Sequence, residues 1–177
     1  IMGQPNDEFP TEQKRENSKT LTVSGKELKD IINNTSYAAS RDDLKPVLQG
    51  VLFQIKNEGI VSVATDGHRL ARADVDLPKG TDGMPSVIVP RKAVVELRKV
   101  LESVEGAVTV SLSDTKARFA ADSVILTTKL IDGTFPDYQR VIPDGNKKVL
   151  RVARQVFLEA VDRVSTVSKD KTRAIKL

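Results

Sequence analysis

A strand followed by a helix recurs three times along the chain, and this recurrence constrains the fold more than any other feature of the sequence. Val23, Val89 and Val152 each end a short apolar strand before a helical pattern, and they are 66 and 63 residues apart. Each unit reads as a strand, a helix and three strands, and one such unit cannot bury both faces of its sheet alone. We therefore expect an α+β fold in which duplicated β-α-β-β-β units, about 20–86 and 87–144, pack two helices on antiparallel sheets.

Local patterns predict the individual elements of these units. Ser24 with Glu27 three residues later fits a capping box, which predicts a helix that fades near residues 39–40. An apolar run predicts a strand over Val47–Ile55, and Pro90 suits the first turn of the second helix. A third unit is predicted to begin with a strand over Leu150–Val152, followed by a helix. Further strands are expected at 108–112, 117–120 and 124–130.

A hairpin is predicted between the strand at 60–64 and the strand at 69–77. Asp66-Gly67 lies between them, and Gly tolerates the positive φ that tight hairpin turns require. The chain's one histidine, His68, follows at once. Three readings stay open here. Asp66 and His68 could form an acid–base site, they could be ordinary turn residues, or His68, Arg69 and Leu70 could form a surface ledge that receives another protein.

Composition excludes several classes of protein. The 177 residues contain no Cys and one His, so neither a disulfide framework nor a thiolate or histidine metal site is expected. No apolar run approaches the roughly 18 residues that would span a bilayer, and we expect a cytoplasmic protein. The formal net charge of +4 permits contact with a polyanion without requiring it. On the second predicted helix, four basic residues outside the apolar stripe, Arg91, Lys92, Arg98 and Lys99, suit phosphate contact.

Residues 1–19 are polar and show no periodicity, so we expect a linker or the tail of a preceding domain. The chain begins with Ile1 rather than an initiator Met, which favours the same interpretation.

Three motifs carry a resemblance to a known family. They are ATDGHRLA at 64–71, VIVPRK at 87–92 and KLIDGTFPDYQRVIP at 129–143. Together, in order and at matching spacing, they resemble the bacterial sliding clamp, the β subunit of the replicative DNA polymerase III holoenzyme. The resemblance implies a ring of two subunits around duplex DNA, each built from three similar domains. Residues 20–144 resemble the complete middle domain, 145–177 the start of the third domain and 1–19 the end of the first.

The resemblance also implies a set of site residues. In the family, a pocket receives short apolar peptides of the polymerase catalytic subunit, the clamp loader and repair polymerases. The matching positions here are Leu48, Thr65, Gly67, His68, Arg69, Leu70, Pro136, Arg140 and Val141. DNA contact would use Arg41, Lys45 and Lys92, since Pro46 and Val47 replace an aromatic pair that family members often carry. Thr166 and Val167 match the interface between the two subunits of the homodimer.

The resulting expectation is a sliding clamp that holds polymerases on DNA, with no catalytic residues, no cofactor and no membrane partner. Two alternatives remain: a stand-alone nucleic-acid-binding domain and a hydrolase that uses Asp66 and His68. The hydrolase lacks a third catalytic partner in the sequence, since there is no second His, no Cys and no Walker-type phosphate loop.

Overall fold

The computed structural model describes residues 18–56, 59–76, 83–167 and 175. The chain divides after Pro136 into two compact units, and each is described by itself. Almost all of the predicted tail at 1–19 lies outside the described residues. The domain boundaries expected at 19 and 144 remain predictions.

The first unit contains two successive sets of one strand, one helix and three strands, as the repeat predicts. The first set is β1 (Lys19–Ser24), α1 (Gly25–Thr35), β2 (Gly50–Lys56), β3 (Gly59–Thr65) and β4 (Leu70–Asp76). The second set is β5 (Val87–Pro90), α2 (Arg91–Val100), β6 (Ala107–Leu112), β7 (Lys116–Ala121) and β8 (Val124–Lys129). Two short 3₁₀ helices, η2 (Ser36–Ala38) and η3 (Pro46–Gln49), connect α1 to β2.

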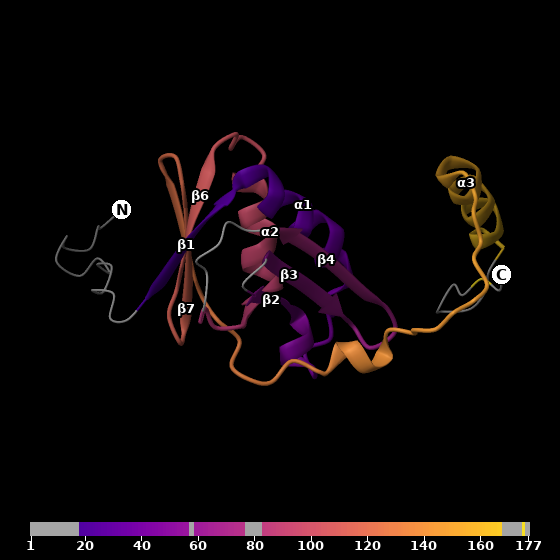
Figure 1. Ribbon diagram of the computed structural model, residues 1–177, viewed down its shortest axis with the longest axis horizontal. Helices are drawn as coiled ribbons and strands as arrows, with labels where there is room; N and C mark the ends of the chain where they lie inside the picture. The colour runs from indigo at the N-terminus through magenta and orange to yellow at the C-terminus, as the bar shows by residue number, and fades with distance from the viewer. Residues whose placement is uncertain (1–17, 57–58, 77–82, 168–174, 176–177) are drawn as a thin grey trace, which may run out of the picture. The chain divides into compact units, whose positions relative to one another are not determined.

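Each of the two sheets contains three strands of one repeat and the first strand of the other. One sheet has the order β1-β6-β7-β8 and the second has the order β4-β3-β2-β5. All the pairings are antiparallel. Figure 1 shows α1 and α2 next to each other, with the sheet that contains β1, β6 and β7 seen edge-on beside them. The α+β class and the repeated unit are confirmed, whereas the exchange of β1 and β5 was not predicted.

The register of the exchanged strands is equivalent in the two repeats. Val23, near the end of β1, pairs with Val108, the second residue of β6. Val89, at the same position of β5, pairs with Val51, the second residue of β2. The two repeats are therefore related by mutual strand exchange at matching positions.

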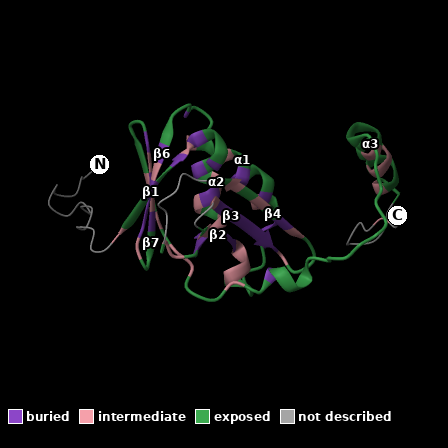
Figure 2. Ribbon diagram, viewed as in Figure 1, coloured by how far each residue is buried: buried purple, intermediate pink, exposed green. Residues whose placement is uncertain are grey.

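One core joins both sheets and both helices of the first unit. In α1 the residues Leu28, Ile31 and Ile32 are almost completely buried, because their spacing places them on one helix face. In α2, Val94 and Leu97 are likewise almost completely buried. Figure 2 shows the buried residues on the facing sides of the helices and on the strands. The core side chains are mostly aliphatic, as the low aromatic content requires.

Two predictions about helix starts are wrong in detail. Ser24 precedes α1, but its side chain makes no capping hydrogen bond. Instead, the backbone N–H of Gly25 donates to the carbonyl of Gly106 at 2.9 Å, so the neighbouring segment supplies an acceptor at this end. Pro90 is the N-cap of α2 rather than a residue of its first turn, because it still pairs with Gly50 as the last residue of β5.

The strand predicted over Val47–Ile55 begins three residues late. Pro46 starts η3 instead, and β2 begins only at Gly50. Within η3 the N–H of Leu48 donates to the carbonyl of Lys45 at 3.0 Å. The carbonyl of Leu48 accepts from the N–H of Ser40 at 2.8 Å. These local bonds use the backbone groups that a strand would have offered to its neighbour.

The second unit contains η4 (Tyr138–Val141) and α3 (Arg154–Ser165). The predicted third helix is therefore confirmed, but the predicted strand at Leu150–Val152 is wrong. No described strand pairs with these residues, and a strand exists only as part of a hydrogen-bonded ladder. Among the helices in the described part of the chain, none has the length and apolar character needed to cross a bilayer.

Candidate functional site

The predicted hairpin is formed by β3 and β4, which pair from Gly59 opposite Asp76 to Thr65 opposite Leu70. The loop Asp66–Arg69 joins the two strands. Gly67 has a φ of +92°, in the left-handed region that favours glycine, so the Asp-Gly signal in the sequence marks the turn correctly. Five of the nine predicted pocket residues, those from Thr65 to Leu70 other than Asp66, thus lie together at one end of this hairpin.

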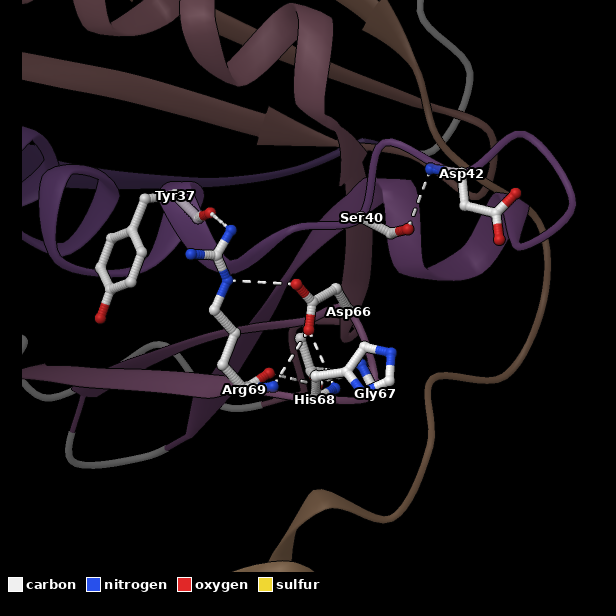
Figure 3. A network of polar contacts seen from close by, with 8 residues as sticks. Tyr37, Ser40, Asp42, Asp66, Gly67, His68 and Arg69 are labelled. Atoms are coloured by element: carbon white, nitrogen blue, oxygen red, sulfur yellow. Dashed lines mark hydrogen bonds and ion pairs between the residues drawn. The ribbon is translucent and has the colours of Figure 1, made fainter. Parts of the chain in front are cut away.

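Side-chain hydrogen bonds fix the loop from inside. Thr65 Oγ1 donates to the carbonyl of Arg69 at 2.7 Å and accepts from the N–H of Gly67 at 3.1 Å. Asp66 Oδ1 accepts from the N–H groups of His68 at 2.9 Å and Arg69 at 3.0 Å. Figure 3 shows the carboxylate of Asp66 turned toward these backbone groups. The loop therefore has a defined shape, which an exposed four-residue connection does not have by default.

Arg69 joins the loop to η2. Its Nε donates to Asp66 Oδ2 at 3.1 Å, and its Nη2 donates to the carbonyl of Tyr37 at 3.0 Å. The guanidinium carbon also lies 5.8 Å from the centre of the Tyr37 ring, within the range of a cation–π contact. Sequence reasoning missed Tyr37, since a single aromatic residue just after a helix produces no periodic signal. Figure 3 shows Tyr37 beside Arg69.

The carboxyl group of Asp66 has a lowered pKa. Burial by itself would raise this pKa, but hydrogen bonds from the backbone of His68 and Arg69, together with the positive charge of Arg69, outweigh burial and lower it. A general base needs a pKa near the working pH and a free oxygen facing its substrate. Asp66 has neither, so the geometry favours a structural role over the acid–base reading.

Leu48 lies in η3, and Lys45 directly precedes this short helix. Leu48 and Leu70 are both half-buried. The short helix η2 packs against β3 and β4. Two residues after η2, Ser40 donates its backbone N–H to the carbonyl of Leu48. Lys45, predicted to contact DNA, places its Nζ 3.9 Å from where a Cβ on Gly67 would lie. A predicted DNA residue therefore neighbours the predicted peptide surface.

The other predicted pocket residues lie at or beyond the end of the first unit. Pro136 is the last residue of that unit, and Arg140 and Val141 belong to η4 of the second unit. Arg140 forms an ion pair with Asp137 at 2.7 Å and is exposed, as is Val141. Their grouping with the hairpin remains a prediction. The same holds for the interface role of Thr166 and Val167, which are exposed at the end of α3.

Arg41 and Lys92, the other two predicted DNA residues, line one open hollow of about 410 Å³. Arg91 lines it as well, so three of its side chains are cationic. Asp43 is the acidic residue in the lining, and its Oδ1 accepts from Gln49 Nε2 at 2.7 Å. The structure thus brings together two residues that are far apart in sequence and adds Arg91 to them.

Comparisons with known proteins give a consistent family. The family model for the central domain of the DNA polymerase III beta subunit matches residues 22–137. The beta sliding clamp of Caulobacter vibrioides is 42% identical over 177 residues, covering 98% of this chain and 48% of that protein. The chain therefore spans about half the length of such relatives.

Solved structures agree with the sequence relatives. A sliding clamp from Bartonella birtlesii bound to griselimycin has 48% identity and a TM-score of 0.87, over 94% of this chain and 46% of that one. A Pseudomonas aeruginosa clamp, also bound to griselimycin, has 35% identity and a TM-score of 0.89, over 96% of this chain and 46% of that one. From its fold, its matched central domain and these relatives, the chain belongs to the DNA polymerase III beta subunit family of bacterial sliding clamps.

Proposed function

We propose that this chain is part of a ring that encircles duplex DNA and holds replication and repair proteins at the template. One observation carries the peptide-binding part of the proposal: the end of the β3–β4 hairpin is internally fixed and presents exposed His68 and Arg69 beside half-buried Leu70. Apolar surface with a charged rim suits recognition of short peptides. Relatives with this fold have been solved with griselimycin bound, which supports a ligand-binding surface in the family.

The mechanism is topological rather than catalytic. A closed homodimeric ring cannot leave DNA sideways, so a polymerase tethered to it stays at high effective concentration near the primer end. The partners in this proposal are the polymerase catalytic subunit, the clamp loader and repair polymerases, each carrying a short apolar peptide. The proposal places the protein in the cytoplasm, as the sequence led us to expect, and it needs no cofactor.

Contact with DNA would be made through phosphates. Arg41, Arg91 and Lys92 line the hollow described above, and Lys45 lies near the hairpin loop. A few cations without bidentate base contacts give attraction that is independent of sequence and sensitive to salt. Such weak contact is compatible with sliding.

Among other functions, a stand-alone nucleic-acid-binding domain is supported by the same cationic hollow. The two functions differ in what they predict for short linear duplexes. A stand-alone domain should bind them with salt-sensitive affinity, whereas a clamp should retain circular DNA and release linear DNA through its ends. Retention of nicked circular DNA by the full-length protein, compared with the same DNA after linearisation, distinguishes them.

The peptide surface is tested by Leu70→Lys in the full-length protein. The lysine ammonium would lie at the half-buried position that follows Arg69 and begins β4. It should abolish griselimycin binding, measured by calorimetry, because a strongly hydrated charge replaces the apolar contact. Thermal unfolding should change little, because Leu70 is only half-buried at the start of β4. Ile125→Lys, at an exposed apolar position of β8 in the other sheet, is the matched control. Equal affinity of both variants and the wild type would contradict the site assignment.

A further inference from the structure

The contact between Tyr37 and Arg69 concerns a residue that neither the sequence patterns nor the family resemblance assigned to the site. Tyr37 lies in η2, 32 residues before Arg69. Both side chains face solvent, with 60% of Tyr37 and 59% of the Arg69 side chain exposed. Tyr37 is not among the buried core residues, and the contacts described for it are those with Arg69.

We propose that Tyr37 is a positioning residue of the partner-binding surface and holds the Arg69 guanidinium in place for an incoming apolar peptide. This inference rests on the proposed function. An exposed arginine normally samples many rotamers, and ordering it when a partner binds lowers affinity. Here Asp66, the Tyr37 carbonyl and the Tyr37 ring fix the guanidinium before any partner arrives.

The charge balance indicates which peptides the surface suits. Asp66 already forms an ion pair with Arg69, so the pair is close to neutral. The Tyr37 ring covers part of the guanidinium, which nevertheless remains accessible. A planar guanidinium held in this way offers a flat, weakly hydrated surface for stacking by an apolar or aromatic side chain. The surface therefore favours an apolar peptide over an acidic one.

The ring contact can be removed without removing the hydrogen bond. Arg69 Nη2 bonds to the backbone carbonyl of Tyr37, which every substitution at position 37 retains. Tyr37→Leu removes the aromatic ring and keeps an apolar side chain. Tyr37→Phe keeps the ring and removes only the hydroxyl, so it serves as the conservative rescue variant.

Two measurements test the inference. Griselimycin affinity is measured by calorimetry on the full-length protein, and the Nε–H signal of Arg69 is followed by ¹H–¹⁵N NMR on the 177-residue chain. We expect Tyr37→Leu to bind about two- to fivefold more weakly, the range expected for an exposed cation–π contact. Its Arg69 Nε–H signal should move toward the position of a free arginine. Tyr37→Phe should match the wild type in both measurements.

The outcomes separate this inference from the proposed function. Wild-type affinity in Tyr37→Leu, or an unchanged Arg69 signal, would overturn the positioning role while leaving the binding surface standing. If the wild-type protein does not bind griselimycin, the proposed binding surface fails and the role in binding fails with it. In that case the Arg69 signal still decides whether Tyr37 holds the side chain, and an unchanged signal overturns that as well.

Discussion

Asp66 accepts hydrogen bonds from the backbone N–H groups of His68 and Arg69 and forms an ion pair with the Arg69 side chain. These contacts resemble those of a helix N-cap, where one carboxylate satisfies backbone donors that have no other partner. At the scale of single residues, the shape of the hairpin end therefore depends on Asp66 together with Thr65, whose hydroxyl bonds to Gly67 and Arg69. The residue that looked most like a catalytic acid in the sequence is a structural acceptor.

The stability contributed by Asp66 should depend on pH in a definite direction. Its pKa is lower in the folded protein, so the contribution is complete above the unfolded value of about 3.9 and is lost as the pH falls through the folded pKa. We expect Asp66→Ala to lower the free energy of unfolding by about 1 kcal/mol at pH 7, the typical cost of losing a cap. Urea unfolding at pH 7, 5 and 3 should show this difference shrinking only at the lowest pH.

Asp66→Asn provides the control for charge. Its side-chain oxygen still accepts the backbone hydrogen bonds, whereas it cannot titrate, so its difference from Asp66→Ala should stay constant with pH. A wild-type advantage over Asp66→Ala that is the same at pH 3 and pH 7 would contradict the account.

Residues of the candidate site could be predicted where their types carry a local signal. Asp66 and Gly67 predicted the turn. Arg69 and Leu70 were candidates because, with His68, they would form a surface ledge after that turn. Tyr37 could not be found, because its role depends on η2 packing against a hairpin that begins more than twenty residues later. Contacts of this kind are set by tertiary packing rather than by spacing.

At the scale of elements, the junction between β2 and β5 leaves no room for a side chain at Gly50. A Cβ there would overlap Ile88 Cγ2 and lie 2.9 Å from Ile131 Cδ1 and 3.1 Å from the Val89 carbonyl. We expect Gly50→Ala to lower the free energy of unfolding by about 1–3 kcal/mol, because the overpacked strands must shift. Gly106→Ala is the matched control, since no atom lies within 4 Å of its added methyl group.

Chemical denaturation of both variants measures this difference. Gly106→Ala should be neutral or slightly more stable than the wild type, because alanine lowers the entropy of the unfolded chain. Equal destabilisation by the two substitutions would show that backbone freedom, rather than crowding at the strand junction, determines the effect.

Elements were predictable where the apolar period was regular. Leu28, Ile31 and Ile32 identify α1, and the alternating runs identify β6 to β8. The predictions failed at 47–49 and at 150–152, where apolar residues are present but the backbone bonds locally or has no paired strand. A hydrophobic run shows that a segment prefers burial, but only a neighbouring strand makes it part of a sheet.

At the scale of the whole molecule, the first unit is held together by the exchange of β1 and β5. Neither repeat has a complete four-stranded sheet of its own. We expect the fragments 20–86 and 87–144 to lack cooperative thermal unfolding when studied separately by circular dichroism. When they are mixed in equal amounts, a cooperative transition should return and its midpoint should rise with concentration.

Cooperative unfolding of either fragment alone would contradict this prediction. Equal molar amounts of one fragment with a scrambled version of the other serve as the control for non-specific association.

The exchange itself could not be read from the sequence. The repeat predicted two similar units, and the simplest assembly keeps each first strand with its own three strands. Val23 would satisfy the apolar pattern equally well opposite either Val51 or Val108, since the two valines occupy equivalent positions. The pattern of apolar residues determines which face of a strand is buried. It does not determine which of two strands with equivalent patterns, here β2 and β6, becomes its partner.

Because Ser24 pairs with Ala107, β1 leaves the ribosome long before its neighbour in the sheet has been made. At typical bacterial translation speeds of roughly 5–20 residues per second, that delay lasts several seconds. During this time a nascent strand with residues that are buried in the folded protein, such as Leu21 and Val23, has no native sheet to join, so its apolar side chains and backbone groups stay unpaired until β6 appears.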